Sequence, residues 1–354
     1  MESFTYESLP GRVVFGRGVI SQVAEEIDRL HKQRAIFIVT GSAARLIPAL
    51  TKQLGNRLAG VFNEVAQHVP TALIEKGLAF ARQNDADCIV TLGGGSATGL
   101  GKGLALKFDA PIIAIPTTFS GSEMTPIYGM TDAGRKQTGR DLRVLPRTVL
   151  YDPELVYSMP PFLAAISGMN ALAHCVEALY GRLASPITSL LAEEGSRALA
   201  QGLPGIVQNP GNHENYDLAL YGAYLAGSVF AVVGSGLHHR ICHVLGGSFG
   251  LPHAETHAVM LPYVIWYNSK AAPEAMTRLA RALAVEDAVK GSFDLAARLH
   301  APRSLAELGL AESDVAEAAG LVVQSPIWNP QPVTLPDLEH LLQAAYRGSG
   351  PELE

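Results

Sequence analysis

The first 150 residues alternate short apolar runs with helical patterns, and this alternation limits the fold more than any other feature. The runs that we interpret as strands are GRVVFGRG, RAIFIVTG, LAGVFNEV, DCIVTLGGG and APIIAIPTTFSG. Amphipathic segments at helical spacing separate them, among them VISQVAEEIDRL and TALIEKGLAFARQND. Strands that are apolar on both faces and alternate with helices are typical of a parallel sheet covered on both sides. We therefore predict an α/β domain with a doubly wound, mostly parallel sheet.

From Pro161 onward, alanine, leucine and helical periodicity dominate, as in PITSLLAEEGSRALAQGLPGIV and YDLALYGAYLAGSVFAVV. The last helix is predicted to begin after Thr334, whose hydroxyl suits an N-cap. We expect an α/β domain over residues 1–157 and an all-helical domain over residues 158–354, with a hinge near residues 152–160. A ligand site in a cleft between the two domains is the usual expectation for this organisation.

Composition narrows the class of protein. The chain has 354 residues, 48% of them hydrophobic and 17% charged, which is the balance of a compact globular protein. Its net charge of −6, without a basic cluster among aromatic residues, argues against a nucleic-acid partner. We expect no secretory leader, and we expect apolar runs such as AGSVFAVVGSGL to be too short and too glycine-rich to cross a membrane. Three widely spaced cysteines, Cys88, Cys175 and Cys242, indicate reduced thiols and a cytoplasmic location.

A glycine-rich turn, Gly93-Gly94-Gly95-Ser96, connects a predicted strand to a predicted helix. Without Cβ atoms the backbone can approach a phosphate, and the N–H groups at a helix N-terminus bind anions. The turn matches neither GxGxxG, because Thr98 stands at the third glycine, nor the Walker A loop. The next strand ends in PTTFSGSE. In this segment we assign Thr117, Thr118 and Ser120 to the cofactor. Two such strand ends at one sheet edge favour a nucleotide site over a tight turn that binds nothing.

Five histidines fall within GLHHRICHVLGGSFGLPHAETH, and another lies in GMNALAHC. Asn170 and His174 are four residues apart in a helical segment, as are His239 and His243, so each pair shares a helix face. His253 is expected in the loop that follows. Imidazoles from two helices and a loop can hold a divalent ion, move a proton or grip an acidic ligand. A single histidine is more often a structural one, but the set at these spacings favours a site.

The glycine turn, PTTFSGSE, GMNALAH and GLHHRICHVLGGSFGLPHA, taken together and in order, resemble the iron-containing alcohol dehydrogenase superfamily. The resemblance implies a dehydroquinate synthase-like architecture with a dinucleotide on the N-terminal domain. It also implies a divalent metal held by an aspartate and three histidines, here His174, His239 and His253, with His243 near the nicotinamide. The aspartate's position is Asn170, whose amide contributes a dipole in place of a charge. We therefore expect a weak or vestigial metal site and turnover that does not require a metal.

Within the superfamily the chain is most similar to the maleylacetate reductases, in SGSEMTPIYGMTDAGRKQTGRDLRVLPRTVLYDP, SGMNALAHCVEALY and IWNPQPVT. This resemblance implies NADH- or NADPH-dependent reduction of the C=C bond of maleylacetate to 3-oxoadipate, late in the breakdown of aromatic compounds. A conjugated enone that accepts hydride becomes an enolate, which hydrogen bonds or a cationic imidazole can stabilise. The substrate is a small dianion, which suits several histidines without an aspartate. Relatives of this kind are commonly homodimers.

The resemblance also suggests a role for each histidine. We expect His243 or His253 to donate the proton, because general acid catalysis needs a group that titrates near the working pH. His174 and His239 are expected to hold the carboxylate or enolate oxygen of the substrate, where relatives hold a metal. If His243 only packs its helix, its loss would lower stability and leave the chemistry intact.

Two further residues are assigned to the cofactor. Lys136 lies in the stretch that resembles the maleylacetate reductases. Gly41 occupies the position at which NAD-selective relatives carry an aspartate, so no charge repels the 2′-phosphate of NADPH. We therefore expect a loose choice between NADH and NADPH.

Three alternatives remain open from the sequence. The first is a metal-dependent alcohol or polyol dehydrogenase in which Asn170 acts as a weaker ligand. The second is a histidine-rich protein that binds a metal or nucleotide without turnover, against which the glycine turn argues. The third is a lyase of the dehydroquinate synthase type, which would need the full metal site.

Overall fold

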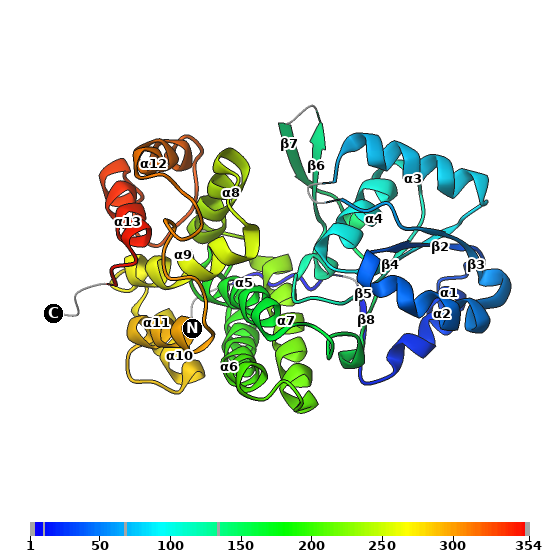
Figure 1. The fold of residues 1–354 in the computed structure, drawn as a ribbon, viewed down its shortest axis with the longest axis horizontal. Coiled ribbons are helices and arrows are strands. Elements are labelled where there is room, and N and C mark those ends of the chain that lie inside the picture. The colour runs from blue at the N-terminus through cyan, green and yellow to red at the C-terminus, as the bar shows by residue number, and fades with distance from the viewer. Residues whose placement is uncertain (1–3, 10, 67–68, 133–134, 351–354) are drawn as a thin grey trace. The chain divides into compact units, whose positions relative to one another are not determined.

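The computed structural model describes residues 4–9, 11–66, 69–132 and 135–350. It divides into two compact units, Ser8–Ser158 and Met159–Glu354, and the described residues before Ser8 belong to the second. Figure 1 shows an α/β unit in blue and cyan and a helical unit whose colours run from green to red.

The α/β unit is built on a six-stranded sheet in the order β1-β8-β5-β4-β2-β3, and every neighbouring pair is parallel. The strands are β1 (Arg12–Phe15), β2 (Ala35–Val39), β3 (Leu58–Phe62), β4 (Cys88–Gly93), β5 (Ile112–Pro116) and β8 (Thr148–Tyr151). The α-helices of this unit are α1 (Val23–Arg29), α2 (Ile47–Leu54), α3 (Thr71–Gln83) and α4 (Gly95–Lys107). Short 3-10 helices connect them: η1 (Val19–Gln22), η2 (Gly41–Leu46), η3 (Gly55–Arg57), η4 (Ser122–Met124), η5 (Leu142–Val144) and η6 (Pro153–Leu155).

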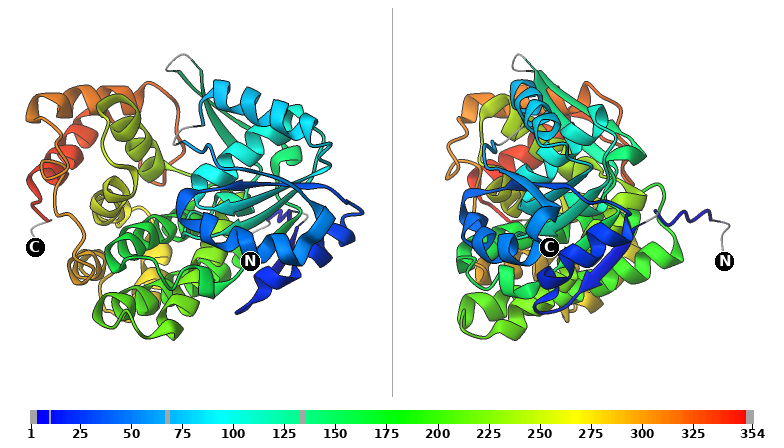
Figure 2. Two further views of the ribbon diagram at one scale, coloured as in Figure 1. Left: turned by 45° about the vertical axis from the view of Figure 1, so that its right-hand side comes forward. Right: turned by 90° about the vertical axis from the view of Figure 1, so that its right-hand side faces the viewer.

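Helices cover both faces of the sheet (Figure 2). Successive residues of a strand point to opposite faces, so Phe37 and Ile38 of β2 lie in different cores. Phe37 packs with residues of α1 and α2, and Ile38 packs with residues of α3 and α4. Both faces of the central strands are buried, which explains their unbroken apolar runs. The predicted doubly wound parallel sheet is confirmed.

A two-stranded antiparallel hairpin, β6 (Ile127–Asp132) and β7 (Arg135–Arg140), was not expected from the sequence. β7 is polar and each strand carries a glycine, so the pair shows neither the apolar runs nor the alternation of a half-buried strand. Lys136 lies in β7 opposite Thr131.

The second unit is helical, as predicted. Its helices are α5 (Pro161–Tyr180), α6 (Pro186–Gln208), α7 (His213–Val233), α8 (Leu237–Phe249), α9 (His253–Asn268), α10 (Pro273–Leu283), α11 (Ala288–Arg298), α12 (Val315–Val323) and α13 (Leu335–Arg347), with a 3-10 turn η7 (Glu312–Asp314). α5, α6 and α7 pack on one another, and α8, α9, α12 and α13 share a second apolar core. The Thr334 hydroxyl accepts a hydrogen bond from the Asp337 N–H at 3.3 Å and caps α13 as predicted.

Two helices, α5 and α7, are long and apolar enough to cross a membrane by length and composition alone. The expectation that every apolar run is too short was therefore wrong on length. In α5, however, 78% of the apolar window is buried within the protein, and in α7 the fraction is 56%. Such burial is what the core helices of a globular unit show, so this similarity to a membrane span is weak.

Candidate active site

The glycine turn lies where β4 ends and α4 begins. Gly93 has a φ of +155°, at the edge of the region that favours glycine, and Gly94 is the N-cap of α4 with no side-chain cap. A Cβ at Gly94 would lie 2.9 Å from Thr118 Oγ1. Gly95 and Ser96 follow at the exposed start of the helix. An uncapped helix N-terminus with no side chain at its cap fits a phosphate group.

This turn lies at the point where the strand order reverses. The chain passes from β2 outward to β3 and then returns to β4, which lies between β2 and β5. Backbone hydrogen bonds connect the three strand ends: Thr40 N–H to Leu92 O at 3.2 Å, and Thr117 N–H to Gly93 O at 3.1 Å. In open α/β sheets, ligands bind in the crevice at such a reversal. Gly41, which directly follows Thr40, is exposed, and a Cβ there would meet no atom within 4 Å.

A buried hydrogen-bond network around Lys102 and Glu123 supports the loop after β5, and sequence reasoning did not find it. The Lys102 ammonium of α4 donates to Ser122 O, Thr125 O, Thr125 Oγ1 and Ile127 O at 2.6, 2.8, 3.0 and 2.7 Å. The nearby carboxylate of Glu123 accepts from Ser120 Oγ at 2.9 Å and from Tyr151 Oη at 2.8 Å. Ser120, assigned to the cofactor, is thus also part of the loop's internal network.

The remaining residues that we assigned to the cofactor lie after β5 and in β7. Thr117 and Thr118 are half-buried at the carboxyl end of β5. Lys136 has a described backbone in β7, and its side chain lies outside the described part of the structure.

The predicted histidines form one cluster in the helical unit, on α5, α8 and α9. The His174 and His239 rings are stacked with centroids 4.2 Å apart. The ring of Phe230 on α7 also stacks on His174, with a centroid distance of 4.1 Å. His243 and His253 are stacked at 6.3 Å, and His239 and His243 are 6.1 Å apart. His174 and His239 are buried, whereas His243 and His253 are exposed. The cluster therefore has a buried floor and an exposed rim.

One expectation about this cluster was wrong. His253 does not lie in a loop but is the first residue of α9, directly after the N-cap Pro252. The preceding proline fixes the backbone at the helix start, and the loop before it is short because α8 continues to Phe249. Three helices, in place of two helices and a loop, supply the imidazoles.

Several polar atoms at the floor are buried without a hydrogen bond to any described residue. They are Asn170 Oδ1, His174 Nδ1 and His239 Nε2. Buried polar groups are normally paired, so several unpaired atoms at one place favour a bound ligand, ion or ordered water there. Burial lowers the pKa of His174, and it lowers that of His239 to about 3, so both rings are neutral. Neutral imidazoles and an amide oxygen are electron-pair donors and fit a divalent ion in type.

Glu177, one turn after His174 on α5, was also missed from the sequence. Its Oε2 lies 2.5 Å from His239 Nδ1, and its Oε1 accepts from the His238 N–H at 2.7 Å. The carboxyl is buried, which raises its pKa to about 7. A lone acidic residue in the otherwise apolar helix NALAHCVEALY was the available signal.

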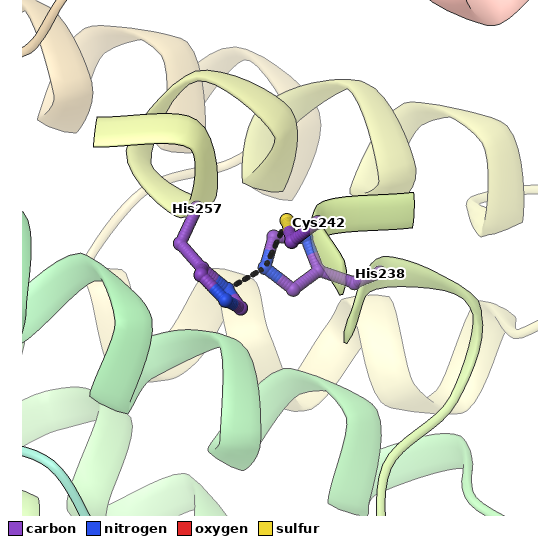
Figure 3. A group of neighbouring side chains, drawn as sticks. All are labelled: His238, Cys242 and His257. Atoms are coloured by element: carbon purple, nitrogen blue, oxygen red, sulfur yellow. Dashed lines mark hydrogen bonds between the residues drawn. The ribbon is translucent and has the colours of Figure 1, made fainter. Parts of the chain in front are cut away.

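A second group lies beside the cluster, made of His238, Cys242 and His257 (Figure 3). Their nitrogen and sulfur atoms lie within 4.8 Å of one another, which is close enough to consider a metal. His238 Nε2 and His257 Nδ1 are 2.8 Å apart, however, and at that distance they share one proton in a hydrogen bond. Burial also raises the pKa of the Cys242 thiol, which opposes a thiolate ligand. We interpret this group as a hydrogen-bonded support for His257, whose ring lies 4.5 Å from His253.

Comparisons with known proteins agree with this geometry. A family model described as iron-containing alcohol dehydrogenase matches residues 10–153, and the model of the C-terminal part of the Fe-containing alcohol dehydrogenase family matches residues 164–346. The chain is 47% identical over 351 residues to the maleylacetate reductase of Burkholderia cepacia, which spans 99% of this chain and 100% of that one. It is 47% identical over 352 residues to the maleylacetate reductase of Rhizobium sp. (strain MTP-10005), with the same coverage.

The solved structures give the same result. The crystal structure of maleylacetate reductase from Agrobacterium tumefaciens matches with a TM-score of 0.96 and 46% identity, over 99% of this chain and 100% of that one. The resemblance drawn from the motifs is confirmed. The chain belongs to the iron-containing alcohol dehydrogenase family, and its relatives within that family include the maleylacetate reductases.

Proposed function

We propose that this protein is a maleylacetate reductase, which reduces the C=C bond of maleylacetate to 3-oxoadipate with NADH or NADPH. The observation that carries the proposal is the 47% identity, over 99% of the chain, to proteins named for this reaction. The cluster of histidines with unpaired buried atoms supports it, because it offers groups that a small polar substrate can use.

The reduced nicotinamide, when bound, supplies the hydride that adds to the carbon β to the ketone. For the chain's own part, Gly93, Gly94, Gly95 and Ser96 bind the pyrophosphate at the start of α4. Thr117 and Thr118 offer hydroxyl groups at the neighbouring strand end. Lys102 and Glu123 keep the loop after β5 in place.

The histidines at the rim complete the reaction. Hydride addition leaves an enolate, and the carbon next to the ketone must then gain a proton. His243 and His253 are exposed, so either ring can exchange protons with water and serve as the donor. Hydrogen bonds from imidazoles to the oxyanion lower its free energy as it forms.

The contact with Glu177 changes the role that we give to His239. Because Glu177 accepts from two backbone N–H groups, we assign it the ionised form, which only accepts, so that His239 Nδ1 carries the proton and Nε2 keeps its lone pair. A neutral ring in this state cannot donate from Nε2 to an anion. We therefore assign substrate binding to His174 and the rim histidines, and give His239 the part of an acceptor.

The residues present also fit a divalent ion. His174, His239, His253 and the Asn170 oxygen would hold it, and such an ion would polarise the substrate's ketone. Asn170 removes the anionic ligand that relatives of the alcohol dehydrogenase type carry, which weakens binding of a hard cation. We propose that turnover does not require the ion. Dialysis against a strong chelator should leave most of the activity, and Asn170→Asp should raise metal affinity.

Loss of NADH absorbance in the presence of maleylacetate tests the proposed reaction directly. The assay is run before and after chelator treatment, with 3-oxoadipate identified as the product. Turnover that survives chelation supports both the reaction and its independence of metal. Turnover that is lost on chelation and restored by iron or zinc refutes metal independence, and activity only with alcohols would establish the dehydrogenase alternative.

We also propose a homodimer in the cytoplasm, without a nucleic-acid or membrane partner. The three cysteines are buried and unpaired, which suits a reducing compartment. Light scattering on the purified chain tests the dimer: a mass near 37.5 kDa would refute it, and twice that mass would support it.

A further inference from the structure

We propose that Glu177 is a positioning residue that fixes the ring and the proton of His239, so that Nε2 of His239 is left as a hydrogen-bond acceptor. The inference rests on the proposed function for its effect on turnover. The geometric part stands on contacts within the helical unit alone.

Glu177 binds α8 at two points with its two oxygen atoms. Oε1 accepts from the backbone N–H groups of His238 and His239, at 2.7 and 3.4 Å. Oε2 lies 2.5 Å from the ring nitrogen Nδ1 of His239. One side chain from α5 thus holds both the backbone and the imidazole of the same residue.

The backbone contact replaces a missing cap. The N-cap of α8 is Gly236, which has no side chain to accept from the first N–H groups of the helix. Glu177 Oε1 takes this place from another helix, and its negative charge suits the positive end of the helix dipole. A Cβ at position 236 would lie 3.1 Å from Oε1, so glycine there leaves room for the carboxylate.

The two oxygen atoms of Glu177 have different partners, and this determines which ring nitrogen of His239 carries the proton. Oε1 already accepts from two backbone N–H groups, so Oε2 alone faces Nδ1, and on this geometry we assign the carboxyl its ionised form, which can only accept. His239 is therefore protonated at Nδ1. Its Nε2, buried and without a hydrogen bond to any described residue, is left as an acceptor. Capping of α8 uses only Oε1 of Glu177. The contact of Oε2 with His239 Nδ1 is therefore additional to the cap and acts on the imidazole ring.

Glu177→Gln tests this arrangement sharply. The amide oxygen should take the position of Oε1, because the two backbone N–H groups require an acceptor. The amide nitrogen then faces Nδ1 with a donor, which should move the ring proton to Nε2. The variant is nearly isosteric, and its effect is a reversal of the tautomer rather than a loss of packing.

The readout is the ¹⁵N NMR spectrum of the histidines in chelator-dialysed, full-length enzyme, with the His239 signal assigned by its loss in His239→Gln. We expect the Nδ1–H form in the wild type and the Nε2–H form in Glu177→Gln. With maleylacetate and NADH, kcat should fall about 10- to 100-fold, because the Nε2–H form removes the acceptor role that the proposed function gives to His239, and losing the partner of a site histidine usually costs this much. The KM for NADH should stay within about twofold.

Tyr180→Phe is the matched control. Tyr180 lies on the same helix and lines the same small cavity of about 180 Å³ as Glu177, and its buried hydroxyl has no hydrogen bond to a described residue. This variant should keep the Nδ1–H form and the wild-type kcat. If Glu177→Gln does not fold, Glu177→Asp replaces it, and its shorter side chain should leave a mixture of both tautomers.

A His239 ring that stays protonated at Nδ1 without the carboxylate would overturn the proposal. A reversed tautomer with unchanged kcat would overturn its functional part. If the wild type does not turn over maleylacetate, the proposed function fails, while the NMR result still decides whether Glu177 sets the proton of His239.

Discussion

Two sets of buried polar groups, one in each unit, differ in how fully they are hydrogen-bonded. In the α/β unit, the Lys102 ammonium is fully buried and donates to four oxygen atoms. In the helical unit, the floor of the histidine cluster is buried as deeply, yet Asn170 Oδ1, His174 Nδ1 and His239 Nε2 meet no partner among the described residues.

The difference separates structural from functional burial. A satisfied buried charge holds the chain in one conformation, and removing it leaves its partners unpaired. An unsatisfied buried donor or acceptor is unfavourable until a ligand supplies the missing contact. We therefore expect substitutions in the first set to lower stability and substitutions around the second set to lower activity.

The largest expected effect on activity is that of His243→Ala. Proton transfer by a positioned group contributes roughly 100- to 10,000-fold, so kcat should fall by at least the lower figure. The side chain is exposed, so the melting temperature should hardly move. Steady-state kinetics and thermal unfolding measure both. His340→Ala, at an exposed histidine of α13, is the control and should keep full activity.

His253→Ala decides between the two rim histidines. If His243→Ala turns over normally while His253→Ala is inactive, the proton donor is His253. If both variants keep most of their activity, the donor lies outside the cluster and the unpaired atoms serve only to bind the substrate.

Lys102→Met should lower the free energy of unfolding by about 3–5 kcal/mol. The substitution leaves the buried carbonyl groups without their hydrogen-bond donor and Glu123 without a nearby positive charge. Urea unfolding of the full chain measures it. Lys76→Met, at an exposed lysine paired with Glu64, should change stability by no more than about 0.5 kcal/mol. If the two substitutions lowered the free energy of unfolding equally, the buried contacts of Lys102 would contribute nothing to stability.

The same lysine gives a pH dependence. Burial lowers the pKa of Lys102 to about 7, below its ordinary value of 10.5. Between these values the unfolded chain binds more protons than the folded one, so the cost of burying the ammonium is relieved as the pH rises. The stability of the wild type relative to Lys102→Met should therefore increase from pH 7 to pH 9.

Gly94→Val should raise the KM for the cofactor about tenfold or more and leave that for the substrate nearly unchanged. The new side chain would press on Thr118, 2.9 Å from the added Cβ, and would occupy the space in front of the helix start. Gly320→Ala, where a Cβ meets nothing within 4 Å, is the control. Equal changes in both Michaelis constants would contradict the cofactor assignment.

The smallest effect concerns the choice of cofactor. Gly41 offers no charge against a 2′-phosphate, so discrimination between NADH and NADPH should stay below about a thousandfold, on the order of 4 kcal/mol. Gly41→Asp should shift the preference towards NADH by about fivefold, since a partly screened like-charge contact is worth roughly 1 kcal/mol. A wild type that already rejects NADPH more strongly would refute the idea.

Much of the fold could be predicted from the sequence because its signals are local. Runs that are apolar on both faces identified the parallel strands, and the order of motifs identified the family. The β6–β7 hairpin was missed because β7 is polar and a glycine interrupts each strand, although Met130 of β6 packs against the core beside α3 and α4. His253 was misplaced because a helix that starts directly after a proline looks like the end of a loop.

Lys102 and Glu177 were missed for a different reason. Each is a single charged residue in a helix, and its partners come from distant parts of the chain: residues 122–127 for Lys102 and His239 for Glu177. No local spacing encodes such contacts. The one signal was a charge among apolar neighbours, in GLGKGLAL and in HCVEALY.

Helix α5 carries Asn170, His174 and Glu177 and is buried along most of its length. Because such burial is typical of segments that open last, we expect the central amides of α5 to exchange with deuterium slowly. The polar groups of the cluster are then assembled before any ligand arrives, and the ligand meets a surface that is already rigid. Binding at such a surface loses little conformational entropy of the protein. This favours small metabolites over partners whose binding would require the site to change its conformation.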